Sequence, residues 1–310
     1  LITGENLDGT IATVERLKEK LIGMDPRDME AIYTVMNRTV AYAGTAKAAI
    51  DLACHDIIGK SANLPLYKVL GGLSGEIETD MTVGIDDPAV MAEHAKAHVQ
   101  AGFNVIKTKV GVDFASDLAR VRAIREAVGD QVKIRLDANQ GWKAKEAVEL
   151  INRLNEYDIE LVEQPVPRFD FEGLKFVTAH SSVPIMADES CWDSKDALQL
   201  VSQRAVDLIN IKLMKCGGIY NALKIASAAE VFGVECMIGC MLEAKISVNA
   251  AVHLACAKNI ITKVDLDGPV LCSEDPILGG AAFDEKIITV ADAPGLGIQG
   301  IDQKYLTYID

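Results

Sequence analysis

Charged side chains close several of the short apolar runs in the middle of this sequence. Three of them are carboxylates, Asp137, Glu163 and Asp188, spaced 26 and 25 residues apart, and Lys212 follows 24 residues later. One strand plus one helix spans each interval, so the four residues would return to equivalent heights on neighbouring strands. Each acid could instead cap the following helix. Three in register, flanked by lysines, favour an oxygen-rich site for a hard cation such as Mg²⁺.

Lysines close the second and the sixth of these runs. In an eight-stranded barrel those two strands lie opposite each other, so Lys109 and Lys212 would approach the centre from opposite sides. A carbon atom bound between them would have an amine on each face. A lysine acts as a base only when its pKa is lowered, and a nearby cation and a second lysine both lower it. Lys107 lies on the same strand face as Lys109 and would supply the positive charge of this second lysine. Ordinary surface ion pairs are the alternative, but they explain poorly why apolar runs end on lysines.

Two more carboxylates, Asp265 and Asp267, flank a single leucine where the last apolar run ends. On a β-strand, residues two apart point to the same face. Like charges on one face repel each other, so we expect a positive group between these two acids.

The elements that must position these residues alternate between short β-rich runs and amphipathic helical stretches. Eight strands separated by helices predict a parallel βα barrel. An open doubly wound sheet is the alternative, but no GxGxxG follows the first strand to support a dinucleotide site. The strands are expected at 78–83, 105–109, 132–137, 159–163, 184–188, 206–212, 234–238 and 262–265.

Three segments of different texture are visible along the chain. Residues 1–74 contain helical patterns without a strand, residues 75–270 contain the barrel pattern, and residues 271–310 contain turns and a short β-like run. We expect the last segment to fold back against the first.

The bulk composition excludes several classes of protein. A net charge of −14 and a pI near 4.9 predict no binding to nucleic acid or to anionic membranes, both of which need a basic surface. The seven cysteines are odd in number and form no CxxC pair, which favours reduced thiols and a cytoplasmic location over a disulfide framework or a zinc site.

The sequence motifs "KTK", "DAN", "EQP", "ADES", "NIK" and "DLD", in this order and at these spacings, resemble the muconate-lactonizing subgroup of the enolase superfamily. Within it the chain is most similar to the dipeptide epimerases, over essentially its whole length. The resemblance implies an α/β fold, a modified TIM barrel of the (β/α)7β type with an α+β capping domain. It also implies Mg²⁺ ligands at Asp137, Glu163 and Asp188, with Lys109 and Lys212 as the acid and base.

The same resemblance implies how a substrate would be held. Lys107 would assist at the substrate carboxylate, Thr82 would contact the substrate, and Asp265 and Asp267 would bind its ammonium group. Cys240 and Met241 follow the seventh strand and are expected to line the pocket.

The expected activity is epimerisation of an L,L-dipeptide by two-lysine 1,1-proton transfer at the α-carbon of its C-terminal residue, through an enolate. N-acylamino acid racemisation, o-succinylbenzoate synthesis and muconate cycloisomerisation are alternatives in the same subgroup. An acyl tail would favour apolar residues at the last strand, and a dicarboxylate would be repelled by its two acids. A non-catalytic binding barrel is the alternative of a different class, and we would expect it to have lost a lysine or a metal ligand.

The resemblance has two further implications. Family members begin with a β-rich part of the capping domain that carries a flexible lid loop, whereas this sequence starts at the capping helices. A homo-oligomer is usual for the relatives.

Overall fold

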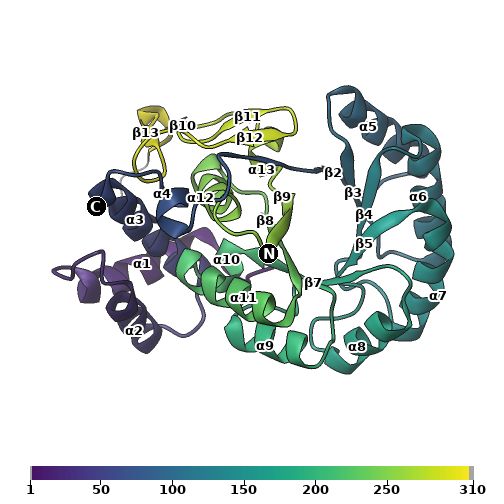
Figure 1. Ribbon diagram of the computed structural model, residues 1–310, viewed down its shortest axis with the longest axis horizontal. Coiled ribbons are helices and arrows are strands. Elements are labelled where there is room, and N and C mark those ends of the chain that lie inside the picture. The colour runs from purple at the N-terminus through teal and green to yellow at the C-terminus, as the bar shows by residue number, and fades with distance from the viewer. Residues whose placement is uncertain (1, 307–310) are drawn as a thin grey trace.

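Parallel strands arranged around a common centre dominate the molecule (Figure 1). The computed structural model describes residues 2–306. Within that range one sheet holds eight parallel strands that follow each other in chain order. They correspond to the eight predicted strands and confirm the barrel. The strands are β2 (Met81–Val83), β3 (Val105–Lys109), β4 (Lys133–Asp137), β5 (Ile159–Glu163), β6 (Ile185–Ala187), β7 (Leu208–Lys212), β8 (Glu235–Gly239) and β9 (Ile261–Asp265).

Helices follow the first seven of these strands, and several form an arc around the strands in Figure 1. They are α5 (Pro88–Gln100), α6 (Phe114–Val128), α7 (Ala144–Leu154) extended by η1 (Asn155–Tyr157), α8 (Phe171–His180), α9 (Ser194–Ser202), α10 (Leu213–Cys216) with α11 (Ile219–Phe232), and α12 (Lys245–Ala255). After β9 the only α-helix within residues 2–306 is the four-residue α13 (Gly268–Leu271), which confirms the (β/α)7β arrangement. No helix between residues 2 and 306 is long and apolar enough to cross a membrane.

An apolar layer fills the inside of the barrel. Its members, one each from β5 to β8, form a buried cluster of their own: Leu161, Met186, Leu208 and Met237. Because side chains two apart on a strand share a face, the next inward layer consists of Glu163, Asp188, Asn210 and Gly239. The polar residues therefore stand above a buried apolar layer.

Polar side chains close the barrel between its end strands, β2 and β9. The backbone N–H of Asp80 donates to the carbonyl of Val264 at 3.3 Å, and that of Leu266 donates to Oγ1 of Thr79 at 2.8 Å. Arg135 of β4 reaches the same place, where its Nη1 lies 2.7 Å from Oδ2 of Asp80 and 3.0 Å from the carbonyl of Val264. The guanidinium thus links β4 to both end strands of the sheet, through Asp80 just before β2 and through Val264 in β9.

The first predicted strand, 78–83, is two separate strands in the structure, so that prediction was wrong in its extent. Residues Glu76–Glu78 form β1, which pairs antiparallel with β12 (Ile287–Thr289) outside the barrel. Only β2 joins the barrel sheet. The buried carboxylate of Asp80 lies between the two strands and pairs with Arg135, which explains the break.

The N-terminal residues form helices that pack around one small apolar cluster. They are α1 (Leu7–Leu21), α2 (Met29–Thr39) and α3 (Gly44–Ala62), and the short α4 (Leu66–Leu70) that follows packs with the main apolar core instead. Helix α3 meets the barrel directly, because a Cβ added to Gly44 would lie 2.6 Å from the carbonyl oxygen of Lys215 in α10.

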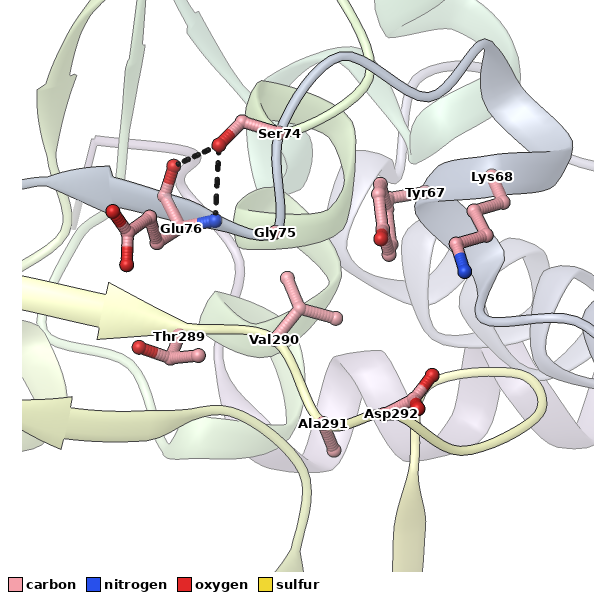
Figure 2. A pocket seen from close by; sticks show the side chains of 9 residues that line it. All are labelled: Tyr67, Lys68, Ser74, Gly75, Glu76, Thr289, Val290, Ala291 and Asp292. Atoms are coloured by element: carbon pink, nitrogen blue, oxygen red, sulfur yellow. Dashed lines mark hydrogen bonds between the residues drawn. The ribbon is translucent and has the colours of Figure 1, made fainter.

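The C-terminal segment returns to these helices. Its further elements are β10 (Ile277–Gly279), β11 (Ala282–Asp284), β13 (Ile298–Ile301) and η2 (Gln303–Tyr305). Gly295 exchanges backbone hydrogen bonds with the stretch before α4, since its carbonyl accepts from Leu66 at 2.8 Å and its N–H donates to Leu64 at 2.9 Å. A cavity of about 520 Å³ lies between α4, β1 and residues 289–292, and Figure 2 shows the side chains that line it. None of the predicted site residues lines it.

Replacement of Arg135 by methionine should destabilise the fold strongly. The substitution leaves the carboxylate of Asp80, which is 1% exposed, without its cation partner. Removing one member of a buried ion pair costs about 3–5 kcal/mol. Urea unfolding followed by circular dichroism should therefore show a much lower midpoint for Arg135→Met than for the wild type.

The matched control is Arg122→Met on the surface of α6. Arg122 pairs with Glu126 with about two thirds of both side chains exposed, so its loss should leave the midpoint essentially unchanged. Equal midpoints for the two variants would contradict a role of Arg135 in closing the barrel.

Candidate active site

A cavity of about 260 Å³ lies at the carboxyl ends of the barrel strands. It brings together every lysine and substrate contact predicted from the sequence. These residues are Thr82, Lys107, Lys109, Lys212, Cys240, Met241, Asp265 and Asp267, and the remaining lining consists of Ile2, Leu242, Gly268 and Leu271. The site is therefore where a βα barrel places its chemistry, on the loops that follow its strands.

The two predicted acid/base lysines face this cavity from opposite sides. Lys109 ends β3 and Lys212 ends β7, which are the second and sixth of the eight strands in the sheet order. The side chain of Lys109 is 28% exposed, whereas that of Lys212 is 4% exposed. A small molecule in the cavity can thus meet an amine from each side.

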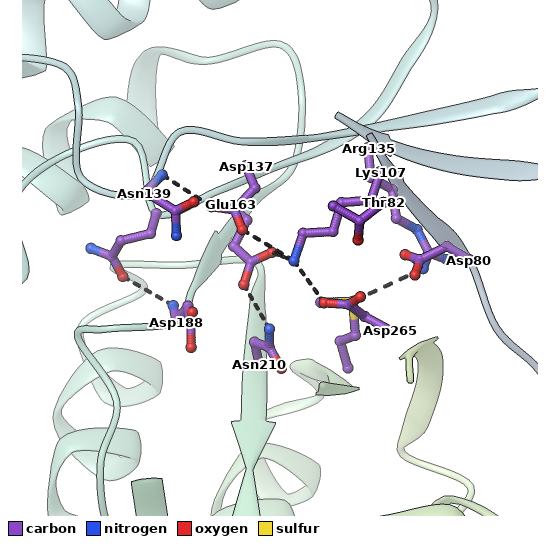
Figure 3. Close-up of polar contacts among 12 residues, drawn as sticks. Asp80, Thr82, Lys107, Arg135, Asp137, Asn139, Glu163, Asp188, Asn210 and Asp265 are labelled. Carbon is purple, nitrogen blue, oxygen red and sulfur yellow. Dashed lines mark hydrogen bonds and ion pairs between the residues drawn. The ribbon is translucent and has the colours of Figure 1, made fainter. Parts of the chain in front are cut away.

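Lys107 lies at the centre of the charged cluster (Figure 3). Its Nζ is 2.6 Å from Oε2 of Glu163, 2.7 Å from Oδ2 of Asp265 and 3.1 Å from Oδ2 of Asp137. Burial alone would lower its pKa, but these carboxylates outweigh burial and raise the pKa of Lys107 well above its usual value. The Lys107 ammonium is therefore already paired with three carboxylates of the protein. Its predicted contact with a substrate carboxylate would be made in addition to these pairs.

Each predicted metal ligand has one oxygen held by the protein. Oδ1 of Asp137 accepts from the backbone N–H of Asn139 at 3.0 Å, and Oε1 of Glu163 accepts from Nδ2 of Asn210 at 2.6 Å. Oδ1 of Asp188 accepts from Nζ of Lys215 at 2.5 Å. The N-cap positions of the helices that follow are other residues, Lys143, Asp170 and Asp193, of which the two aspartates accept backbone N–H groups. Helix capping therefore does not account for these three carboxylates.

The second oxygen of each ligand faces a lysine. Oδ2 of Asp137 lies 2.6 Å from Nζ of Lys109, Oε2 of Glu163 lies beside Lys107, and Oδ2 of Asp188 lies 2.9 Å from Nζ of Lys212. Accordingly, no group of three or more His, Cys, Asp or Glu side chains within residues 2–306 is already arranged around a metal position.

The chemistry of this donor set nevertheless suits a divalent cation. Oε2 of Glu163 has no hydrogen-bond partner in the part of the chain that the structure describes, although Nζ of Lys107 is close enough for an ion pair. Burial and the neighbouring charge of Asp137 raise the pKa of Glu163 to about 7. A buried carboxylate with an unsatisfied oxygen beside two other acids is the setting in which Mg²⁺ binds.

The pKa of Lys212 differs from the expectation for a base. Burial lowers it, but the charges of Asp188 and Glu163 outweigh burial and raise the pKa of Lys212 above its usual value. In this arrangement the charges of the acids around Lys212 outweigh those of the neighbouring lysines, and the lowering expected beside a bound cation stays a prediction.

The prediction that Asp265 and Asp267 lie on one face of a strand was wrong. Strand β9 ends at Asp265, and the chain turns so that Asp267 precedes α13. Of these two acids only Asp265 has a cation from residues 2–306 within ion-pair distance, and that cation is Lys107. Oδ2 of Asp267 accepts from the backbone N–H of Thr82 at 2.8 Å, and burial together with Asp265 raises the pKa of Asp267. Both acids still line the cavity.

Cys240 and Met241 lie beside the cavity as predicted, in the loop after β8. Burial, followed by the charge of Asp265, raises the pKa of the Cys240 thiol well above its usual value. A thiol in that state is a poor nucleophile, so Cys240 is part of the wall of the pocket.

Two protein-family descriptions match the sequence of this chain. "Mandelate racemase / muconate lactonizing enzyme, N-terminal domain" covers residues 2–71, and "Enolase C-terminal domain-like" covers residues 90–304. The chain belongs to the enolase superfamily. The family predicted from the strand-end motifs is thus confirmed.

Several members of the enolase superfamily are closely similar. The hydrophobic dipeptide epimerase of Enterococcus faecalis is 52% identical over 96% of this chain and 84% of that protein. The L-Ala-D/L-Glu epimerase of Clostridium acetobutylicum is 50% identical over 97% and 85%, respectively. The crystal structure of the Enterococcus faecalis dipeptide epimerase with Mg and the dipeptide L-Leu-L-Tyr superposes with a TM-score of 0.94 at 52% identity, covering 96% of this chain and 84% of that one.

Two residues of this site were not predicted from the sequence. Lys215 is 4% exposed, and its Nζ contacts Asp188, while Asn210 is fully buried and contacts Glu163. The spacings to Lys212 were available as signals, since Asn210 precedes it by two residues on a strand and Lys215 follows it by three. Their partners could not be read from the sequence, because both lie on other strands.

Replacement of Glu163 by glutamine should change how stability of the metal-free protein depends on pH. The pKa of Glu163 is about 7 in the folded protein and 4.5 is its ordinary value. The folded state therefore holds this proton more tightly, and the contribution to stability is present below pH 4.5 and lost as pH rises to 7. The wild type should therefore lose stability as pH rises from 5 to 8, whereas Glu163→Gln should not. The urea midpoint of Glu163→Gln minus that of the wild type, measured with a metal chelator present, should increase over this range.

The control for that measurement is Glu149→Gln on the exposed face of α7. Its urea midpoint should differ little from that of the wild type between pH 5 and pH 8, because an exposed ion pair contributes little to stability. A pH-independent difference for Glu163→Gln as well would contradict the raised pKa of Glu163.

Proposed function

We propose that this chain is a Mg²⁺-dependent dipeptide epimerase that inverts the α-carbon of the C-terminal residue of an L,L-dipeptide. The observation that carries the proposal is the opposed pair Lys109 and Lys212, which face one small cavity from two sides. The relatives that are half identical to this chain, named as dipeptide epimerases, support the same reaction.

The residues that would hold the cation are Asp137, Glu163 and Asp188. Each would offer the oxygen that now faces a lysine, while its other oxygen stays with Asn139, Asn210 or Lys215. When bound, Mg²⁺ would supply positive charge that stabilises the negative charge developing on the substrate carboxylate and lowers the pKa of the nearby lysines.

The two lysines would carry the proton transfer. One Nζ in its neutral form removes the α-proton, and the opposite Nζ, as an ammonium, returns a proton to the other face of the carbon. The configuration of the entering substrate decides which lysine is base and which is acid. Lys107 keeps its positive charge throughout, because carboxylates surround it, and offsets the negative charge of the enolate.

The substrate ammonium would bind at Asp267. Its carboxylate lines the cavity and accepts only a backbone N–H from Thr82 among its hydrogen bonds to described residues, whereas Asp265 is already paired with Lys107. Met241 and Leu242 on the cavity wall favour dipeptides with apolar side chains. An N-acylated amino acid would place an uncharged tail against these acids, and a dicarboxylate would be repelled by them.

We also propose the division of the chain that the sequence suggests. Residues 1–74 and 271–310 would form the capping domain, and residues 75–270 the catalytic barrel. The return of Gly295 to the stretch before α4 supports this grouping. A homo-oligomer in the cytoplasm remains our expectation for the assembly and its location.

Single lysine variants should separate the two half-reactions. With Mg²⁺ in D₂O, the wild type should place deuterium at the α-carbon of L-Leu-L-Tyr and of its epimer, as followed by mass spectrometry. Lys109→Ala and Lys212→Ala should each lose epimerisation, because one face has no proton donor. Each should still exchange the α-proton of one epimer, and the two variants should retain opposite epimers.

Two results would contradict the epimerase proposal. Exchange by the wild type with N-succinyl amino acids but with no dipeptide would favour the acylamino acid racemases. Exchange with neither class of compound would favour a non-catalytic binding barrel.

The substitution Asp267→Asn should weaken dipeptide turnover far more than Mg²⁺ binding. It removes the carboxylate proposed for the ammonium while it leaves Asp137, Glu163 and Asp188 unchanged. A charged hydrogen bond lost from a substrate costs about 1.5–3 kcal/mol, so kcat/KM should fall about 10–100-fold. Steady-state kinetics and calorimetric titration with Mg²⁺ would measure the two effects.

The matched control is Asp284→Asn on the exposed strand β11. It should change neither quantity. A fall in Mg²⁺ affinity as large as the fall in kcat/KM for Asp267→Asn would place this residue with the metal site instead.

A further inference from the structure

Asn210 lies in the polar layer of the barrel, directly beside one predicted metal ligand. It belongs to β7, is fully buried, and shares the inward face with Lys212 two residues later. Its Nδ2 donates to Oε1 of Glu163 at 2.6 Å (Figure 3). The amide thus reaches from β7 past β6 to β5, since β6 stands between these strands in the sheet.

The neighbouring strand leaves space for this amide. A Cβ added to Gly239 of β8 would lie 2.6 Å from Oδ1 and 2.9 Å from Nδ2 of Asn210. Gly239 does not have a positive φ, so backbone conformation gives no reason for glycine at this position. The reason is steric, because any larger residue would push the Asn210 side chain away from Glu163.

The other end of the amide argues against a role in packing alone. Oδ1 of Asn210 has no hydrogen-bond partner among the residues that the structure describes. A buried carbonyl without a partner disfavours folding, so an apolar residue of similar shape would pack at less cost in stability. The amide is therefore explained by its one hydrogen bond, to Glu163.

We propose that Asn210 is a positioning residue, which fixes Oε1 of Glu163 so that Oε2 alone is presented to the cation. The inference rests on the proposed Mg²⁺ site. The backbone of Asn139 and the ammonium of Lys215 hold one oxygen of the other two ligands in the same way. Asn210 differs from Lys215 because it orients its carboxylate without adding charge. Its removal therefore changes orientation and leaves the charge balance of the site unaltered.

The test is Asn210→Leu, which keeps the approximate shape and removes the hydrogen bond. Calorimetric titration of the metal-free protein with MgCl₂ should show a Kd about 10–100-fold higher than that of the wild type, the usual effect of losing a residue that orients a metal ligand. At saturating Mg²⁺ the variant should recover kcat, with KM for the dipeptide little changed, because the lysines are intact.

Gly239→Ala provides a second, independent variant. It keeps Asn210 in the sequence but displaces its amide, and it should weaken Mg²⁺ binding in the same direction. This variant also tests the proposal if Asn210→Leu does not fold.

The matched control is Asn249→Leu in α12. Asn249 is equally buried and makes two side-chain hydrogen bonds, to Leu296 and Ala281, away from the cavity. It should lower stability and leave the Kd for Mg²⁺ unchanged.

The outcomes separate this inference from the proposed function. If the wild type binds Mg²⁺ and both Asn210→Leu and Gly239→Ala bind it within twofold of the wild type, the positioning role is overturned and the proposed function stands. If the wild type itself binds no Mg²⁺, the proposed metal site is overturned, and this inference with it.

Discussion

The ammonium of Lys107 holds the centre of this structure together. It contacts carboxylates from three other places in the barrel, Asp137 on β4, Glu163 on β5 and Asp265 on β9. Burying charges is costly unless they are paired, and removing Lys107 would leave three acids without a shared partner. The strands that carry these acids are therefore held in one arrangement, and the spacing of the lysines that face the cavity depends on it. Beneath them lies the buried apolar layer that contains Leu161.

The N-terminal helices contribute to the same site through the loop that follows β7. Gly44 lets the start of α3 press against carbonyl groups of α10, and Asp51 of α3 accepts from the backbone N–H of Ile219 at 2.5 Å. The hydroxyl of Tyr33 in α2 donates to the carbonyl of Gly217. These contacts fix the segment directly after Lys212, including Lys215. The helices therefore support the strand end that carries Lys212, even though none of the lysines that line the cavity belongs to them.

Much of this arrangement could be predicted from the sequence, and the part that could not has a common cause. The strands and their closing residues repeat with the period of a βα unit, so Asp137, Glu163, Asp188 and Lys212 could be placed on one rim of a barrel. Pairings across the barrel follow from the final curvature of the sheet, and no local pattern encodes that. The contact between Lys107 and Asp265, 158 residues apart, is of this kind. So is the bond from Asn210 to Glu163.

The two acids around Leu266 show what such a pairing changes. From the sequence they form a symmetric pair of equal charges, and both were assigned to the substrate ammonium. In the structure Lys107 and Lys212 lower the pKa of Asp265 against the effect of its burial, whereas burial and Asp265 itself raise the pKa of Asp267. Asp265 is therefore an ionised partner of a protein lysine before any ligand arrives. Asp267 is the acid that gains most from an incoming ammonium, because that cation would offset the charge of Asp265 and pair with a buried carboxylate that has no lysine partner within ion-pair distance among the described residues. We infer that the pair divides its work, with Asp265 keeping Lys107 in place and Asp267 recognising the substrate.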